Sequence, residues 1–339
     1  DNLEQPTHAD GVPRHVPPQA EFVYGDVRRI DDVARALHGV DGVIHLAATG
    51  GFTPELSRYF QTNSIGTANL LELVAERRNR IKKVVVASSV AIYGEGSYHC
   101  PSCGTCAGAM RSVASLEQGT WEPRCAKCGE ILAPAPTAES KSPSPENAYA
   151  ISKYDEERLV LSFGRQFDVD TCALRYFLTY GPRQSLTNPY TGVIAIFSSL
   201  LLAGRRPVLF EDGRQQRDFV FVEDVARANV LALEHADSAG EVFNVGTGFG
   251  TPIADVAATL AELLDLPGQA AEIPDEFRPN EARHVFADIS KIRKLGFEPQ
   301  VDLRTGLSHY LDWVRGEGDV RDYFTAAMPA LRQSGVVRP

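Results

Sequence analysis

The strongest constraint on the fold of this chain is the alternation of apolar runs of strand length with longer helical segments. The run KKVVVASS at 82–89 is the clearest strand, because a Val-rich segment is typical of a strand covered on both faces. Strands separated by helices form βαβ units with parallel strands and right-handed crossovers. The expected strands are 21–27, 42–48, 82–89 and 171–177, and the expected helices are 31–39, 63–79 and 149–167. The sequence therefore predicts an α/β fold with a doubly wound parallel sheet.

The pattern changes from about residue 185, where short strands alternate with helices of ordinary length. The strands are expected within 207–213 and 218–224, and the helices at 193–204, 224–237, 252–265 and 303–315. This mixture predicts a smaller α/β lobe over 185–317, next to a larger domain over 1–184. The tail, 318–339, has no clear pairing partner in the pattern, so we expect it to be partly ordered at best.

Composition and charge exclude several classes of function. Hydrophobic residues make up 43% of the chain and charged residues 23%, which is ordinary for a globular protein. No apolar run approaches the 18 residues of a membrane-spanning helix, and no secretory leader is visible, so we expect a cytoplasmic protein without membrane contact. The net charge of −10 argues against nucleic acid as a partner, because the average field repels phosphates.

Five of the six cysteines lie close together, between residues 100 and 128, in a segment (about 95–137) that the sheet does not need. They include two C-x-x-C pairs separated by 21 residues, the spacing of a four-thiolate zinc knuckle. The expected ligands of a structural Zn²⁺ are Cys100, Cys103, Cys125 and Cys128. Cys106 and His99 are further candidates, and the alternative is a flexible loop with free or disulfide-linked cysteines. Four thiolates would leave no open position, so we do not expect a catalytic metal.

A Gly-rich turn between the first strand and helix, which holds the pyrophosphate in doubly wound dinucleotide folds, is absent from the sequence. The chain begins at Asp1-Asn2, which is similar to the end of a second strand in such folds. We therefore expect that the first β-α-β unit is missing from this sequence because the chain is truncated at its N-terminus. The alternative is a protein that cannot hold a dinucleotide.

Tyr149 and Lys153 form a Y-x-x-x-K pair at the start of a predicted helix. Their i,i+4 spacing puts both on one face, where an ammonium stabilises a phenolate and makes the tyrosine a usable acid and base. Ser89 ends the Val-rich strand, at the edge where open α/β sheets bind ligands. The alternative is a packed tyrosine, a solvated lysine and a serine that caps the next turn.

With these residues in place, the sequence resembles the extended short-chain dehydrogenase/reductases, specifically the sugar-nucleotide epimerases and dehydratases, over nearly its whole length. The motifs are G-D-V at 25–27, H-L-A-A at 45–48, Y-A-I-S-K at 149–153, R-Y-F at 175–177, Y-G-P-R-Q at 180–184, R-D-F at 217–219 and N-V-G at 244–246. Leu178 replaces an Asn that is usual in this family. The resemblance implies a Rossmann-like NAD-binding domain over 1–184 and a mainly substrate-binding lobe over 185–317.

The resemblance also implies roles for individual residues. The catalytic residues would be Ser89, Tyr149 and Lys153. The NAD-binding residues would be Asp1, Asn2, Asp26, Val27, Leu46, Ala47, Ala48, Asn63, Tyr149, Lys153 and Tyr176. The residues that bind a nucleotide sugar would be Ser89, Asn188, Arg217 and Arg278, of which the two arginines suit a diphosphate because a guanidinium binds phosphate oxygens bidentately. For each arginine the alternative is a surface ion pair.

The reaction can be narrowed within this family. Dehydratases resemble one another in an Asp-Glu pair directly after the Ser or Thr, where this chain has Val90 and Ala91. We therefore expect C4 epimerisation through a transient 4-keto sugar. The insert and the stretch SLTNPYTGVIAIF resemble dTDP-L-rhamnose 4-epimerases, which implies a dTDP-sugar substrate, dTDP-L-rhamnose, and dTDP-6-deoxy-L-talose as product.

Other functions stay open at this point. One is another sugar-nucleotide oxidoreductase or decarboxylase, and another is a non-catalytic dinucleotide-binding or zinc-scaffold protein. The helices at 63–79 and 149–167 are apolar over more than one face. In similar enzymes these two helices pair across a two-fold axis, so the resemblance implies a homodimer. The alternative is burial against the sheet and its neighbours.

Overall fold

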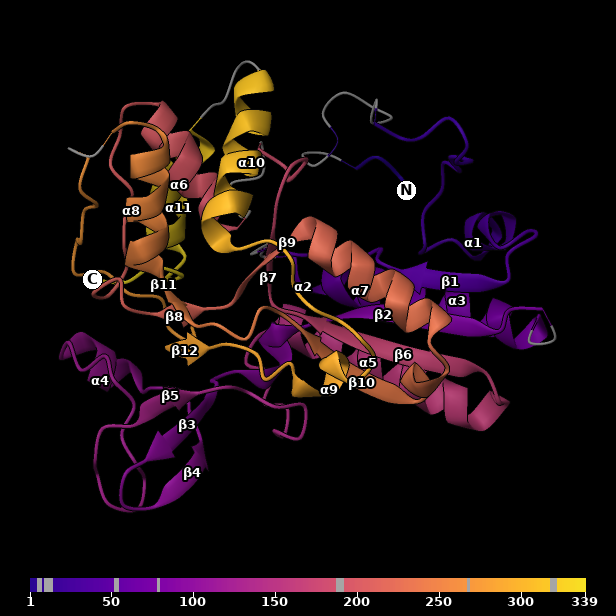
Figure 1. Ribbon diagram of the computed structural model, residues 1–339, viewed down its shortest axis with the longest axis horizontal. Helices are drawn as coiled ribbons and strands as arrows, with labels where there is room; N and C mark the ends of the chain where they lie inside the picture. Colours follow the sequence, from indigo (N-terminus) through magenta and orange to yellow (C-terminus); the bar gives the residue numbers. More distant parts are fainter. Residues whose placement is uncertain are drawn as a thin grey trace.

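A parallel sheet forms the middle layer of one half of the molecule, on the right in Figure 1. The structure is a computed structural model and describes residues 1–4, 8, 15–51, 55–77, 80–186, 192–266, 269–317 and 322–339. Within these residues the sheet has the strand order β1-β2-β6-β10, and every neighbouring pair is parallel. The strands are β1 (Gly42–His45), β2 (Lys83–Ser89), β6 (Asp170–Tyr176) and β10 (Glu241–Val245). The predicted α/β fold with a parallel central sheet is confirmed.

Helices cover both faces of this sheet. Val84 and Val86 of β2 point to one face, where α1 (Ile30–Ala36), α3 (Gly66–Glu76) and α5 (Ala148–Phe167) pack. Val85 points to the other, against α7 (Val222–Glu234) and α9 (Ser290–Arg293). All three valines have no exposed surface, as the period-two alternation of a strand between two helical layers requires.

Two expected elements differ from the structure. Residues 21–26 form no strand; Asp1 exchanges backbone hydrogen bonds with Val23 and Gly25, but these two bonds make no ladder. The helix expected at 63–79 begins earlier, with α2 (Leu56–Tyr59), and continues through a π-helical turn at Phe60–Ile65 into α3. Asn63 therefore lies inside a helix, and its expected place at a helix start is wrong.

The second half of the chain forms a separate apolar core. Its helices are α6 (Val193–Leu202), α8 (Ile253–Leu263) and α10 (Leu303–Gly316), which pack around the parallel strands β7 (Leu178–Tyr180) and β9 (Phe219–Phe221). A small sheet has the order β11 (Thr251–Pro252), β8 (Gln216–Arg217), β12 (His284–Val285). Short 3-10 turns lie at Val90–Tyr93 and Ala236–Ser238.

The C-terminal segment is ordered, contrary to the expectation of a loose tail. Over the described residues 322–339 it forms α11 (Tyr323–Gln333), whose Phe324, Met328 and Leu331 pack on Leu200 of α6. Phe277 and Arg338 exchange two backbone hydrogen bonds. The expectation was wrong because the partner of the tail is a helix distant in sequence.

The Cys-rich insert forms a small unit that projects from the body, at the lower left of Figure 1. It contains an antiparallel sheet in the order β4 (Gly104–Ala107), β3 (Ser97–Cys100), β5 (Ala133–Ala135), and the short helix α4 (Val113–Glu117). Among the described residues, no helix combines the length and apolar character that crossing a membrane requires.

Candidate active site

Tyr149 and Lys153 lie in the first turns of α5, as predicted. The helix begins there because Asn147 caps it, its side chain accepting a hydrogen bond from the backbone N–H of Ala150 at 2.9 Å. Lys153 is buried, whereas Tyr149 is half-buried and its ring centroid lies 6.1 Å from that of Tyr59. Part of the Tyr149 side chain is therefore exposed, whereas the Lys153 side chain lies in the protein interior.

Ser88 and Ser89, at the end of β2, have different tasks. Ser88 donates to Glu157 of α5 at 2.6 Å, which fixes the helix against the strand. The Ser89 oxygen accepts a hydrogen bond from the backbone N–H of Ala91 at 3.1 Å and so caps the turn that follows. A hydroxyl both accepts and donates, so this cap leaves the Ser89 proton available for an oxygen of a ligand.

Asn63 joins the active-site elements to one another. Its side-chain oxygen accepts from the backbone N–H of Thr49 at 2.7 Å, and its amide donates to the Thr49 carbonyl at 3.1 Å. The same amide donates to Ser152 at 2.9 Å, and Ser152 donates to the Tyr149 carbonyl at 2.8 Å. Asn63 sits in the π-helical turn, a distortion that is frequent at functional sites. In this structure its side chain positions the loop after β1 and the start of α5.

A buried polar cluster surrounds Lys153, and the sequence reasoning missed it. The Lys153 ammonium donates to Glu156 at 2.5 Å, and the other oxygen of Glu156 lies 3.5 Å from His45 Nε2. Burial raises the pKa of Glu156 to about 7 against the pull of Lys153. Burial, with a contribution from Lys153, lowers the pKa of His45 to about 4. The local signal was the i,i+3 spacing of Lys153 and Glu156, which favours an ion pair on a helix.

Arg175 is part of the scaffold. It pairs with Glu157 through two hydrogen bonds of 2.7 and 3.0 Å and donates to the Tyr93 hydroxyl at 2.7 Å. Tyr176, expected to contact NAD, donates its hydroxyl proton to Asn229 of α7 at 2.7 Å. These contacts tie β6 to the helices on either side and hold the carboxyl edge of the sheet in place.

The two arginines expected to bind a diphosphate have different surroundings. Arg217 is buried and donates to the carbonyl oxygens of Gln216, Ala282 and Arg283, and its Nη2 lies 3.2 Å from Glu281. Arg278 is half-buried, with its guanidinium 4.6 Å from the centre of the Phe210 ring. Asn188 lies outside the described residues. Most Arg217 donors are thus directed at the backbone of its neighbours.

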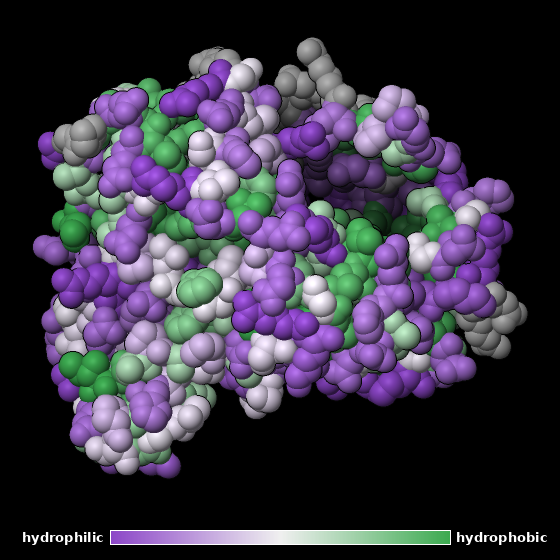
Figure 2. Space-filling model, in the orientation of Figure 1, coloured by the Kyte–Doolittle hydropathy of each residue, from purple (hydrophilic) through white to green (hydrophobic). Residues whose placement is uncertain are grey.

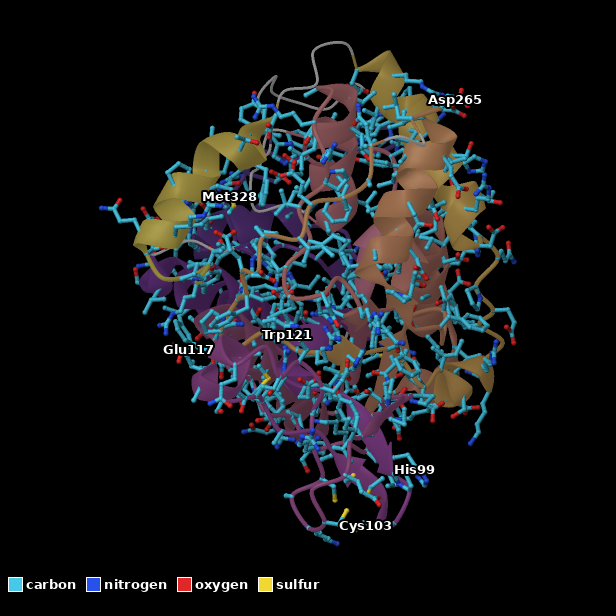
Figure 3. The ribbon with its side chains drawn as sticks, turned by 90° about the vertical axis from the view of Figure 1, so that its left-hand side faces the viewer. His99, Cys103, Glu117, Trp121, Asp265 and Met328 are labelled. Atoms are coloured by element: carbon cyan, nitrogen blue, oxygen red, sulfur yellow. The ribbon has the colours of Figure 1, made fainter. Side chains whose placement is uncertain are left out.

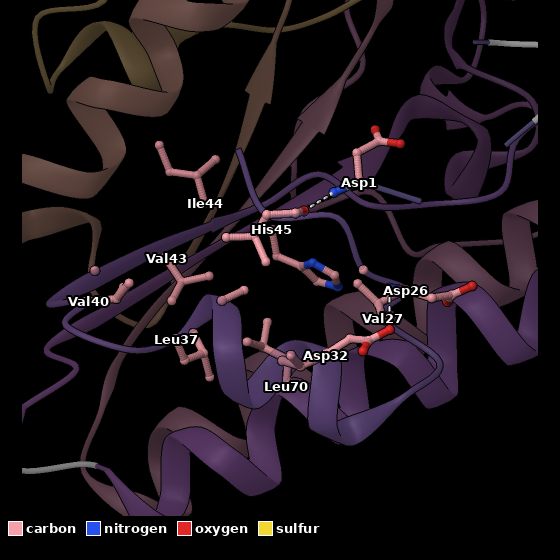
Figure 4. A pocket seen from close by; sticks show the side chains of 15 residues that line it. Asp1, Asp26, Val27, Asp32, Leu37, Val40, Val43, Ile44, His45 and Leu70 are labelled. Atoms are coloured by element: carbon pink, nitrogen blue, oxygen red, sulfur yellow. Dashed lines mark hydrogen bonds between the residues drawn. The ribbon is translucent and has the colours of Figure 1, made fainter. Parts of the chain in front are cut away.

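A hollow of about 290 Å³ lies beside the outer edge of β1 (Figure 4). The space-filling view is hollowed in the same quarter, below the N-terminal segment (Figure 2). Asp1, Asp26 and His45 contribute polar atoms, and the remaining lining is mainly apolar side chains from β1, α1 and α3.

The residues expected at the adenosine end of a dinucleotide border this hollow. Asp26 accepts hydrogen bonds from Arg28 and, at 3.2 Å, from Asn2, and the bond from Arg28 lowers the pKa of Asp26 to about 2. Val27 packs so tightly against α3 that a Cβ at Gly66 would lie 2.7 Å from its side chain. The segment 46–48 follows β1 and is exposed, so apolar surface faces solvent at the carboxyl end of a parallel strand.

The four cysteines of the two C-x-x-C pairs converge at the tip of the insert. Their sulfur atoms all lie within 4.8 Å of one another, and those of Cys100 and Cys128 are 3.4 Å apart. Tetrahedral zinc with Zn–S bonds near 2.3 Å would separate its sulfurs by about 3.8 Å. Cys106 lies outside this group, with its sulfur directed at the Gly104 carbonyl. Figure 3 shows Cys103 and His99 at the far end of the insert from Trp121.

Buried charges join the insert to the second lobe, and no motif indicated them. Arg283 has no exposed surface and contacts Glu122 of the insert together with Glu211 and Asp212. Arg111 of the insert makes two hydrogen bonds with Glu211, at 2.7 and 2.9 Å. The insert is therefore fixed to the lobe that contains Arg217.

Comparison with known proteins agrees with this arrangement. The model of the NAD dependent epimerase/dehydratase family matches residues 2–110 and 126–246, on both sides of a gap within the insert. A dTDP-L-rhamnose 4-epimerase of Burkholderia thailandensis is 32% identical, over 94% of this chain and 88% of that protein.

Solved structures give the same result. The UDP-glucose 4-epimerase of Thermotoga maritima, crystallised with UDP-glucose, has a TM-score of 0.72 and 28% identity, covering 92% of this chain and 90% of the other. The UDP-glucose 4-epimerase of Thermus thermophilus, in complex with NAD, has a TM-score of 0.68 and 27% identity, with 91% and 89% covered. The family match spans well over half of the residues. This chain therefore belongs to the NAD-dependent epimerase/dehydratase family.

Proposed function

We propose that this protein catalyses the NAD-dependent epimerisation of a nucleotide sugar at C4. The observation that carries the proposal is the arrangement of Tyr149 and Lys153 in the first turns of α5, which Ser88 and Glu157 fasten to the strand that ends in Ser89. A purely binding protein has no need of a tyrosine, a buried lysine and a strand-terminal serine together on these two elements. The dTDP-L-rhamnose 4-epimerase and the UDP-glucose 4-epimerases similar to this chain support the same activity.

For NAD, we propose an adenosine site at the hollow beside β1 and a nicotinamide site near Tyr149. The hollow beside β1, with the ionised Asp26 at its border, suits an adenosine, and the exposed apolar segment 46–48 leads from there toward Tyr149. The sequence has no G-x-x-G-x-x-G motif, so no residue is assigned to the pyrophosphate. When bound, NAD would accept the hydride from C4 of the sugar and return it to the opposite face.

The side chains of the protein would handle the proton. Tyr149 Oη would take the proton of the sugar 4-hydroxyl. It would return the proton after the transient 4-keto sugar has rotated to present its other face. Ser89 would donate a hydrogen bond to the same sugar oxygen while keeping its proton, and Lys153 would stabilise the phenolate. Val90 and Ala91 lie in the turn after Ser89 and carry no acid for eliminating water, so the site suits epimerisation better than dehydration.

For the substrate we propose dTDP-L-rhamnose, with dTDP-6-deoxy-L-talose as product. The Burkholderia relative supports this choice, and the Thermotoga neighbour makes UDP-sugars the main competitor. Residues 185–317 would form the main substrate lobe and residues 1–184 the NAD domain. Arg217 and Arg278 would face the diphosphate, and Asn188 the sugar.

We also propose a structural Zn²⁺ bound by Cys100, Cys103, Cys125 and Cys128. The support is the convergence of four sulfurs from two separate turns of the insert, a set of ligands that would complete a tetrahedral shell. In addition, we propose a homodimer in which the helices α3 and α5 pair with those of a second copy. Ile65 and Ile151, 52% and 45% exposed, are apolar side chains on these helical segments that such pairing would cover.

The decisive experiment is incubation of the purified protein and NAD with dTDP-L-rhamnose and, separately, with UDP-glucose, followed by NMR of the sugar. We expect a C4 epimer of dTDP-L-rhamnose and no net change in nicotinamide absorbance. Accumulation of NADH or loss of a carboxyl group would instead assign a reductase or decarboxylase. Failure to bind NAD, measured first by equilibrium dialysis, would favour a scaffold protein.

A further inference from the structure

The Lys153 ammonium faces a carboxylate that the proposed reaction does not use. Glu156 lies one turn further along α5 and accepts a hydrogen bond from Lys153 Nζ at 2.5 Å. The Lys153 side chain is 3% exposed and that of Glu156 is 0% exposed, so water screens neither charge. An ammonium that serves a phenol on one side is thus countered by an anion on the other.

The surroundings leave Lys153 as the main partner of Glu156. From β1, His45 Nε2 lies 3.5 Å from the second oxygen of Glu156, but its low pKa keeps this ring neutral. From α3, the Thr67 hydroxyl donates to the Asn63 carbonyl at 2.5 Å, and its proximity to Glu156 is one of the smaller influences that lower the pKa of this carboxyl group. That second oxygen accordingly makes no hydrogen bond within the part of the chain that the structure describes.

Two further titratable groups interact electrostatically with the Glu156 carboxylate without forming a hydrogen bond to it. Asp155, on the same helix, favours the protonated form of Glu156 by repulsion. Tyr176, from β6, has its pKa raised mainly by burial and partly by Glu156. With burial as the largest cause, the pKa of Glu156 reaches about 7, so its charge changes close to neutral pH.

We propose that Glu156 is a positioning residue that sets how much of the Lys153 charge acts on Tyr149. The inference rests on the proposed function, whose base is Tyr149. As a carboxylate, Glu156 holds the ammonium and cancels part of its field. When Glu156 takes up a proton, the ammonium is uncompensated and stabilises the Tyr149 phenolate more strongly. The pair therefore keeps the phenolate available as the pH falls through the neutral range.

The test uses the ionisation of Tyr149 itself, which requires no turnover. Tyrosinate absorbance is titrated in the wild-type protein and in Glu156→Gln, and the part lost in Tyr149→Phe is assigned to Tyr149. We expect the Gln variant to form tyrosinate at a pH lower by about one unit, a tenfold change in the equilibrium, because a neutral amide cannot cancel the ammonium. Glu156→Asp, which retains the carboxylate, should titrate like the wild type.

Glu146→Gln serves as the matched control. The Glu146 carboxylate is exposed and binds Ser144 just before α5, so its loss is screened by water and should leave the Tyr149 titration unchanged. If Tyr149 ionises in Glu156→Gln at the same pH as in the wild type, or at a higher pH, the proposal is wrong. The acid limb of the pH–rate profile of epimerisation should shift in the same direction as the pH at which tyrosinate absorbance appears. Absorbance that moves without any turnover would count against the proposed function alone.

A variant that does not fold would still leave a measurement on the wild-type protein. Infrared spectroscopy should detect a buried carboxyl group that loses its proton near neutral pH, accompanied by a change in the Tyr149 tyrosinate signal at the same pH. A spectrum without such a group would overturn the proposal.

Discussion

Arg283 and Glu122 lie 161 residues apart in sequence, yet their side chains form an ion pair with an N···O distance of 2.5 Å. Glu122 also contacts His284 at 3.0 Å. Nearby, Glu95 accepts hydrogen bonds from the backbone N–H groups of Arg283 and His284. The insert therefore contacts both the side chains and the backbone of residues 283–284, next to the strand pair with Gln216–Arg217. These contacts stabilise the second lobe.

The first prediction is that Glu122→Gln destabilises the second lobe. The loss should be about 1 kcal/mol, since Glu122 is partly exposed and Arg283 keeps Glu211 and Asp212 as partners. Chemical denaturation measures the change. Glu117→Gln is the control, because Glu117 is an exposed residue of α4 in the same insert (Figure 3). This variant should unfold at the same denaturant concentration as the wild type.

Acid unfolding should depend on the same residue. Burial alone would raise the pKa of Glu122, but the hydrogen bonds from His284 and Arg283 lower it from 4.5 to about 2. The stabilisation is thus complete above pH 4.5 and is lost as the pH falls through about 2. The stability difference between the wild type and Glu122→Gln should shrink over this window. A difference that stays constant down to pH 2 would contradict the assignment.

Zinc content should distinguish two cysteines of one hairpin. We expect about one zinc per chain in the wild type, and a loss of most of it in Cys103→Ser, because three thiolates close the shell incompletely. Cys106→Ser should keep its zinc, since Cys106 stands outside the cluster. Metal analysis of the purified variants decides this. If the metal stabilises the second lobe through the contacts of Glu122 with Arg283 and His284, a chelator should lower the melting temperature less in Glu122→Gln than in the wild type.

The sequence allowed prediction where a signal is local. Tyr149 and Lys153 share a helix face by their spacing, and the cysteines are recognisable by theirs. Contacts between distant segments left no such signal, as Glu122 and Arg283 illustrate. In α11 the apolar positions Phe324, Met328 and Leu331 do have helical spacing, but Pro329 argues against a helix. Packing on α6 outweighs that local preference, and sequence patterns do not contain this information.

Tyr149→Phe should abolish turnover, with a loss of at least about a hundredfold, the lower range for removal of a general acid and base. Folding should be intact, because no hydrogen bond of the Tyr149 hydroxyl is among the contacts of the described residues. Sugar NMR measures turnover and circular dichroism the fold. Tyr154→Phe, which changes a tyrosine one turn away that packs against the core, is the control. Full activity of the Tyr149 variant would remove this residue from the mechanism.

The last prediction concerns the ion pair behind the site. Glu157 is the ion-pair partner of Arg175 and accepts a hydrogen bond from the Ser88 hydroxyl, and the side chains of Glu157 and Arg175 are nearly inaccessible to water. Glu157→Leu should therefore cost about 3 kcal/mol, because it leaves the Arg175 charge buried without its carboxylate. The double variant Glu157→Leu, Arg175→Met removes both charges and should recover part of this loss. If denaturation shows the double variant to be less stable than Glu157→Leu, the penalty does not come from the stranded guanidinium. The contact of Arg175 with Tyr93 would then be its main contribution.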